Sequence, residues 1–277
     1  MLKNFSPKLF VNNIYETLSK TKMFIVLIIL CFNCISRLRN IIQCSLHLDI
    51  NLSIYDLIMY IFNNFPTVLF TLNFLFLFLI PDILLEKSSY LLSIIRYKNR
   101  TQWYKNKLLS ILFISICYVT LIIIICCIIG IGNLNFDNVW NNGSIIINDK
   151  LNNGFMNNFT PINLVIITSL FLILNFTSIG IFFYIGVLIF KKDFYGFLFS
   201  LFPIVSTALI HKLHYINLYG ISLYNNINFL NHNVTQSNTY FILSKCTLYW
   251  ILIISICNGI GFYLVKNMDF NFGGSNE

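Results

Sequence analysis

Charged residues are scarce in this sequence. Only 10% of its 277 residues are Asp, Glu, Lys or Arg, whereas 57% are hydrophobic, and the mean hydropathy is +0.75. Soluble domains carry about 25% charged residues, because a solvated exterior has to cover the apolar core. The scarcity of charge therefore excludes an ordinary soluble domain. It predicts an integral membrane protein with several spans of about 20 apolar residues each.

Motifs for catalysis and nucleotide binding are also lacking. The chain contains no G-x-x-x-x-G-K-[S/T] loop for phosphates, no H-E-x-x-H and no G-x-S-x-G. His211 and His214 are the closest His pair, and no carboxylate or third His adjoins them to complete a metal site. We therefore expect no catalytic residue, no metal, no cofactor and no enzymatic activity in this chain.

Ionisable residues are nearly missing from the apolar stretches as well. Ion-coupled carriers usually need carboxylates, His or Lys in the middle of the membrane, so this class is disfavoured. The polar groups that remain there are mainly amides. Asn175 and Asn258 are expected to form hydrogen bonds between helices. Cys31 and Cys34 form a C-x-x-C without the second pair or His cluster that zinc requires, and are read as apolar side chains.

Six apolar stretches are predicted to span the membrane. They lie at about 23–36, 58–80, 108–131, 162–190, 194–210 and 240–265. The second is interrupted by Asn63, Asn64 and Pro66, which predicts a kink near the proline. Arg37 and Arg39 are expected to end the first span. The predicted fold class is an all-α membrane protein with one six-helix domain over residues 23–265.

Short polar segments flank this domain. In residues 1–22, Leu9, Phe10, Ile14 and Leu18 recur at helical spacing between polar residues, which predicts an amphipathic helix on the membrane surface. Residues 266–277 form a polar tail. The stretches 40–56, 133–160 and 211–239 are read as outer loops, and the last two are rich in Asn.

The distribution of basic residues predicts the orientation. If both termini are cytoplasmic, 13 of the 18 Lys and Arg residues lie on the cytoplasmic side, as the positive-inside rule requires. The net charge of +8 is then explained by topology, and no basic domain stands outside the spans to bind nucleic acid.

The densest group of charges lies between the second and third spans, in the loop 82–107. Its sequence S-I-I-R-Y-K-N-R-T-Q-W-Y-K-N-K mixes cations with aromatic residues. Arg96, Arg100, Trp103 and Lys107 follow helical spacing, and Arg and aromatic residues are the types that anchor protein interfaces. The stretch therefore suits a surface helix that docks on a partner. The alternative is a lipid anchor that fixes the topology, and the two roles are compatible.

The same stretch resembles the ABC-2-type permease subunits of bacterial ABC transporters. In that family an Arg-Tyr-x-x-Arg-x-x-Trp segment precedes a Lys and the third span; here these positions are Arg96, Tyr97, Arg100, Trp103 and Lys107. The ending Y-L-V-K-N-M-D-F after the last apolar stretch is also similar to that of such subunits. Small permeases of this kind often serve the export of bacteriocins or lantibiotics, or immunity to them.

The resemblance implies a permease subunit in a bacterial cell membrane. It would pair with a second copy or a related subunit, and its 82–107 loop would act as a coupling helix docked on a separate cytosolic ATPase. The residues expected at that contact are Glu86, Arg96, Tyr97, Arg100, Trp103 and Lys107. Glu86, with Asp82, is expected to pair with the basic residues or to face the partner. The alternative is a polytopic scaffold or trafficking protein of the Yip1-like type, without transport activity.

Overall fold

The computed structural model describes residues 21–48, 52–81, 100–147, 151, 153–213, 218–232 and 238–267. Throughout these ranges the regular elements are helices, and no strand forms. Five helices are long and apolar enough to cross a membrane: α2 (Thr21–Leu48), α7 (Arg100–Gly130), α10 (Pro161–Phe190), α11 (Asp193–Lys212) and α13 (Thr239–Asn267). The prediction of an all-helical membrane protein is confirmed at this level. A sixth span is counted if the bent pair α3 and η1–α4 forms one.

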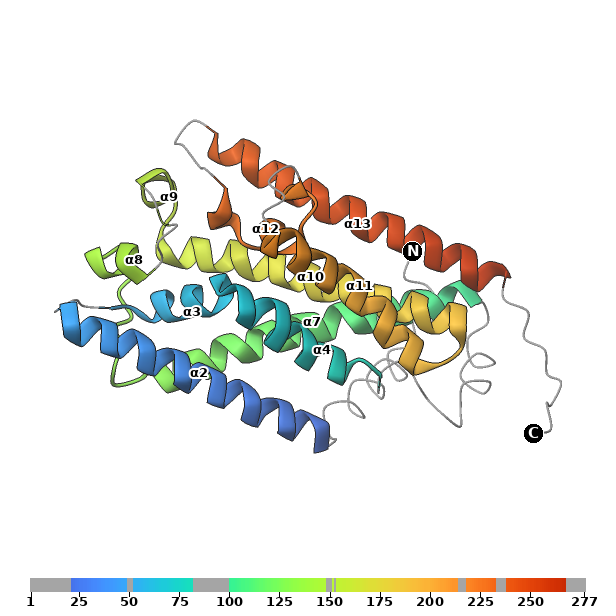
Figure 1. Cartoon of the computed structure of the whole chain (residues 1–277), viewed down its shortest axis with the longest axis horizontal. Helices are drawn as coiled ribbons and strands as arrows, with labels where there is room; N and C mark the ends of the chain where they lie inside the picture. Colours follow the sequence, from blue (N-terminus) through green and yellow to red (C-terminus); the bar gives the residue numbers. More distant parts are fainter. Residues whose placement is uncertain are drawn as a thin grey trace.

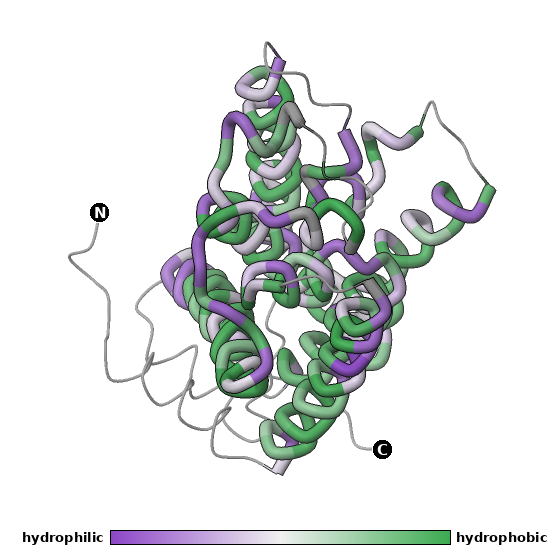
Figure 2. Tube along the Cα trace, turned by 90° about the vertical axis from the view of Figure 1, so that its left-hand side faces the viewer, coloured by the Kyte–Doolittle hydropathy of each residue, from purple (hydrophilic) through white to green (hydrophobic). Residues whose placement is uncertain are grey.

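The long helices lie roughly side by side along the longest axis of the molecule (Figure 1). Helix α10 is the most buried of the five and packs against α7, α11 and α13. Hydrophobic residues dominate the long helices in Figure 2, and hydrophilic ones gather mostly in the connecting segments. Of the predicted N-terminal segment, only Thr21 and Lys22 are described. The tail from residue 268 and the orientation of the termini stay predictions.

Helix α2 is longer than the predicted first span. It continues through Arg37 and Arg39 to Leu48. The sequence of α2 contains no Gly or Pro, and Arg is a good helix former. A change from apolar to polar residues therefore marks where the chain leaves the lipid, but it does not end the helix.

The stretch predicted as the second span is broken near Pro66, as the proline predicts. Helix α3 (Ile54–Asn63) is followed by the π-helix η1 (Thr67–Leu72) and by α4 (Asn73–Leu79), with a bend of 76° at the break. Helix α3 also starts earlier than the predicted residue 58. Its start is set by a capping box, in which the Ser53 N–H and hydroxyl both donate to Asp56 Oδ2 at 2.9 Å.

Helices α10 and α11 form a hairpin with a very short connection. Lys191 ends α10 in the left-handed conformation, with φ at 55°, and Asp193 begins α11. The two helices approach closely where Gly186 faces Gly196. A Cβ on Gly186 would lie only 2.9 Å from Gly196 Cα. This contact makes α10 and α11 one packed unit.

The stretch 211–239, read from the sequence as an outer loop, is partly structured and buried. Its described part contains α12 (Leu223–Ile227) and the short 3-10 helix η3 (Phe229–Asn231). All five residues of α12 are buried. In Figure 1, α12 lies over α10 within the bundle, and both α10 and α13 contact it. We call residues 218–232 the cap segment.

Candidate functional site

Only part of the predicted coupling loop falls within the described residues. Glu86, Arg96 and Tyr97 lie outside them. Arg100 begins α7 and is exposed, so the helix starts eight residues before the predicted third span at Leu108. Its earlier start reflects a run of residues without Gly or Pro, as in α2.

Trp103 and Lys107 lie in the first two turns of α7, but their side chains point into the fold. They are 1% and 3% exposed, respectively. The Trp103 ring is 5.9 Å from the ring of Tyr184 on α10, and Tyr104 stacks on the same Tyr184 ring at 5.5 Å. These aromatic side chains therefore brace the base of α7 against α10. Arg100, in contrast, stays on the surface.

A second and more complete site lies where the second span breaks. Asn64 Oδ1 accepts hydrogen bonds from the Thr67 N–H at 3.1 Å and from the Thr67 hydroxyl at 2.7 Å. Asn64 thus caps the first turn after the break, as Asn commonly does at helix starts. This cap gives a hydrogen-bond acceptor to the Thr67 backbone N–H, since N–H groups in the first turn of a helix have no acceptor within the helix.

Arg37 reaches this break from α2. Its Nη2 donates to Asn64 Oδ1 at 3.1 Å and to Thr67 Oγ1 at 2.8 Å, and its guanidinium lies 5.9 Å from the centre of the Tyr60 ring. Arg37 is half-buried, whereas Thr67 is buried. We call Arg37, Tyr60, Asn64 and Thr67 the broken-helix site. The sequence signal for it was the Asn-Asn-Phe-Pro interruption, but no pattern linked that interruption to Arg37.

The cap segment closes the other side of the break. The Tyr224 hydroxyl donates to the Asn63 carbonyl, and Asn228 Nδ2 donates to the Tyr224 hydroxyl at 3.2 Å. The Phe65 ring packs edge-on against Tyr224, with centroids 4.8 Å apart. Burial raises the pKa of Tyr224 to about 12, so this hydroxyl keeps its proton and remains a donor at neutral pH.

Hydrogen bonds from the long helices hold the cap segment in place. Trp250 Nε1 on α13 donates to the Asn226 carbonyl at 3.1 Å, and the Leu223 N–H donates to Thr207 Oγ1 on α11 at 3.2 Å. Side-chain amides of the segment donate hydrogen bonds to its own backbone carbonyls. For example, Asn226 Nδ2 donates to the Ser222 carbonyl at 2.9 Å. The Asn-rich composition is therefore used for internal hydrogen bonds in a buried segment.

Polar groups continue along the broken span beyond the site. The Tyr118 hydroxyl on α7 donates to the Leu72 carbonyl at 3.1 Å, at the end of the π-helix. One residue further, Asn175 Nδ2 on α10 donates to Asn73 Oδ1 at 2.9 Å. Both Asn side chains are completely buried, and the expectation that Asn175 bonds between helices is confirmed. We call Asn73 and Asn175 the inner amide pair.

The inner amide pair is not saturated by the part of the chain that the structure describes. Asn73 Nδ2 and Asn175 Oδ1 have no hydrogen-bond partner there, although both atoms are buried. An unmet buried donor or acceptor costs about 1–3 kcal/mol, and such groups in a native fold call for an explanation. The broken-helix site and the inner amide pair together form a polar line along the second span, through an otherwise apolar bundle.

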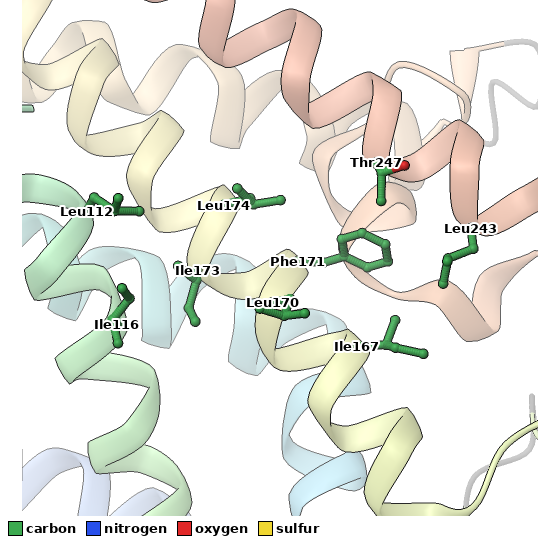
Figure 3. A pocket seen from close by; sticks show the side chains of 9 residues that line it. All are labelled: Leu112, Ile116, Ile167, Leu170, Phe171, Ile173, Leu174, Leu243 and Thr247. Atoms are coloured by element: carbon green, nitrogen blue, oxygen red, sulfur yellow. The ribbon is translucent and has the colours of Figure 1, made fainter. Parts of the chain in front are cut away.

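A purely apolar pocket lies on another face of the bundle. It has a volume of about 410 Å³ and opens between α7, α10 and α13. Figure 3 shows the nine side chains that line it, among them Leu112, Ile116, Leu170, Phe171, Leu243 and Thr247. The pocket can hold a hydrocarbon chain, but it offers almost no polar group to orient a ligand.

The described ranges bring together no group of three His, Cys, Asp or Glu side chains that would hold a metal ion. Cys34 of the C-x-x-C contacts Cys126 on α7, with the sulfurs 3.7 Å apart. His211 packs on the Phe65 ring with centroids 4.2 Å apart. These side chains are therefore placed by packing between helices.

Comparisons of the sequence and the fold with protein-family models, curated proteins and solved structures find no match.

Proposed function

We propose that this chain is the membrane-spanning subunit of an ABC transporter of the ABC-2 type, and that its cargo path follows the polar line along the second span. The observation that carries the proposal is the break in that span inside the bundle. Backbone outside helices is tolerated at membrane depth only where protein buries it or it lines a cavity. Discontinuous spans of this kind are typical of binding sites in transporters.

The energy source in this proposal is a separate ATPase. The chain has no phosphate-binding loop of its own. Because Trp103 and Lys107 are buried, the contact of the proposed docking segment is formed by Glu86, Arg96, Tyr97 and Arg100. Arg100 marks its exposed end at the start of α7. Docking there would place the ATPase at the end of a helix that enters the bundle.

Helix α7 offers a rigid link from that end to the polar line. It contains no Pro, and Tyr118 lies 18 residues after Arg100, which is about 27 Å along a helix. Trp103 braces the base of α7 against Tyr184, and Tyr118 holds the Leu72 carbonyl at the π-helix. A displacement at the docking segment would thus move the Tyr118 hydroxyl relative to the broken span.

The proposal also includes the assembly and the membrane. Two copies, or one copy and a related subunit, would enclose the path in a bacterial cell membrane, with both termini cytoplasmic. The long apolar helices support insertion in lipid. The apolar walls and scattered amides suit a lipid-like or amphipathic peptide cargo, as in bacteriocin export or immunity.

Co-purification from the native membrane tests the proposal. We expect an ATP-binding-cassette ATPase to be recovered with the tagged full chain, and we expect its ATP hydrolysis to change when this chain is added. Recovery without any ATPase, together with unchanged hydrolysis, would contradict the proposal and would favour the Yip1-like scaffold instead.

A further inference from the structure

The guanidinium of Arg37 is only partly used by the protein. Its two hydrogen bonds both come from Nη2 and go to neutral acceptors, Asn64 Oδ1 and Thr67 Oγ1. A guanidinium has five N–H donors, so Nε and Nη1 keep three of them. Within the described residues these three donors have no hydrogen-bond partner. The two bonds hold the group in place at the break.

The charge of Arg37 is likewise not balanced by the described part of the chain. Three carboxylates lie there: Asp56, Asp137 and Asp193. Asp56 Oδ2 accepts from the Ser53 N–H and hydroxyl, and neither of the other two forms an ion pair with Arg37. A half-buried cation held by neutral oxygens favours an anion as its further ligand, because burial strengthens the attraction between opposite charges.

The depth of Arg37 indicates which anion this is. The apolar run of α2 from Met23 to Ser36 covers 14 residues, which is about 20 Å of helix, and Arg37 follows directly. A hydrocarbon core is about 30 Å thick, so Arg37 lies inside its outer edge. The long side chain of an Arg near the end of a span extends toward the headgroups, which carry phosphate. Because Nη2 is occupied by Asn64 and Thr67, a phosphate would take single charge-assisted hydrogen bonds from Nη1 or Nε.

We propose that Arg37 binds a phosphate group at the broken-helix site, with Asn64 and Thr67 holding the guanidinium in position. The phosphate belongs either to a phospholipid headgroup or to a free phosphate anion. The bound group fixes α2 against the break between α3 and η1. This inference does not depend on the proposed transport function, because a scaffold protein with the same fold would bind the same group.

Arg39 provides the matched control. It lies two residues from Arg37 on the same helix and carries the same charge, but it is exposed. Arg37→Gln and Arg39→Gln therefore change the net charge equally. Only the first removes the cation that contacts Asn64 and Thr67. Arg37→Lys keeps the charge but lacks the additional guanidinium donors, so it separates loss of binding from loss of folding.

The experiment is a native mass-spectrometric titration of the purified full chain with dioleoyl phosphatidylglycerol, and with dioleoylglycerol as the lipid without phosphate. We expect Arg37→Gln to weaken phosphatidylglycerol binding about tenfold or more, as for a lost charge-assisted pair. Arg39→Gln is expected to bind like the wild type. Arg37→Lys is expected to bind phosphatidylglycerol with intermediate affinity, and dioleoylglycerol is expected to bind all variants alike.

A second arm measures the melting temperature in inorganic phosphate, with chloride at equal ionic strength as the reference. An increase in the wild type and Arg39→Gln, but not in Arg37→Gln, would assign the site to free phosphate; lipid binding alone would assign it to a headgroup. The proposal is overturned if Arg37→Gln matches the wild type in both arms. It is also overturned if Arg39→Gln loses as much binding as Arg37→Gln.

Discussion

Replacing Gly186 with Ala should destabilise the α10–α11 hairpin. The new Cβ would lie 2.7 Å from Phe199 Cβ, 2.9 Å from Gly196 Cα and 3.1 Å from the Tyr195 carbonyl oxygen. Two of these three atoms belong to the backbone of α11, so a rotamer change cannot relieve the contact. The two helices would have to move apart along a seam that buries much of α10.

The expected magnitude is the difference of two effects. Overpacking of a tight contact costs about 1–3 kcal/mol, and the upper part of that range applies because the backbone has to shift. Ala is favoured over Gly in a helix by about 1 kcal/mol. We therefore expect Gly186→Ala to lower the free energy of unfolding by about 1–2 kcal/mol.

Gly259→Ala on α13 is the matched control, because a Cβ at Gly259 would meet no atom within 4 Å. It keeps only the helix-propensity gain, so its stability should equal or exceed that of the wild type. The assay is equilibrium unfolding of the purified chain in mild detergent, followed by circular dichroism. Equal stability of Gly186→Ala and the wild type, or equal shifts in both variants, would refute the packing of α10 on α11.

Three further predictions concern other contacts. Tyr118→Phe removes the donor to the Leu72 carbonyl and should cost about 1–2 kcal/mol in the same unfolding assay; an unchanged midpoint would exclude this bond. Copper phenanthroline should join Cys34 and Cys126, whose sulfurs are 3.7 Å apart, and a non-reducing peptide map without that pair would contradict the packing of α2 on α7. Burial, with a smaller effect from Lys245, lowers the pKa of His232 below its usual 6.5, although the hydrogen bond to the Asn225 carbonyl opposes this; the neutral ring is therefore favoured in the fold, and stability should fall as the pH drops below about 6.5. His232→Gln should lose this pH dependence, and an identical pH profile would refute it.

Much of the fold could be predicted from local sequence. The apolar runs predicted the long helices, and Pro66 predicted the break between Asn63 and Thr67. The burial of residues 222–228 could not be predicted, because an Asn-rich composition is the same in a solvated loop and in a buried segment with internal hydrogen bonds. The contact that distinguishes them joins Tyr224 to the Asn63 carbonyl across 161 residues, which no local pattern encodes.

The broken-helix site shows the same limit. Arg37 was expected to end a span, since a cation after an apolar run usually marks the membrane boundary. The sequence gives the position of the charge along α2, but not the side of the helix on which a broken neighbour lies. The bonds from Arg37 to Asn64 and Thr67 depend on how two helices pack, and therefore only the three-dimensional fold reveals them.

The most direct test of the transport account is charge reversal in the docking segment. Arg96 and Arg100 would be changed together to Glu, and Lys191 and Lys192, which are exposed at another predicted cytoplasmic turn, would be changed to Glu as the control pair. The measurement is the amount of ABC ATPase that co-purifies with equal amounts of membrane-inserted chain. We predict that the ATPase is lost with Arg96 and Arg100 reversed, and retained with Lys191 and Lys192 reversed. An ATPase retained equally in both variants, or absent even with the wild-type chain, would contradict the account.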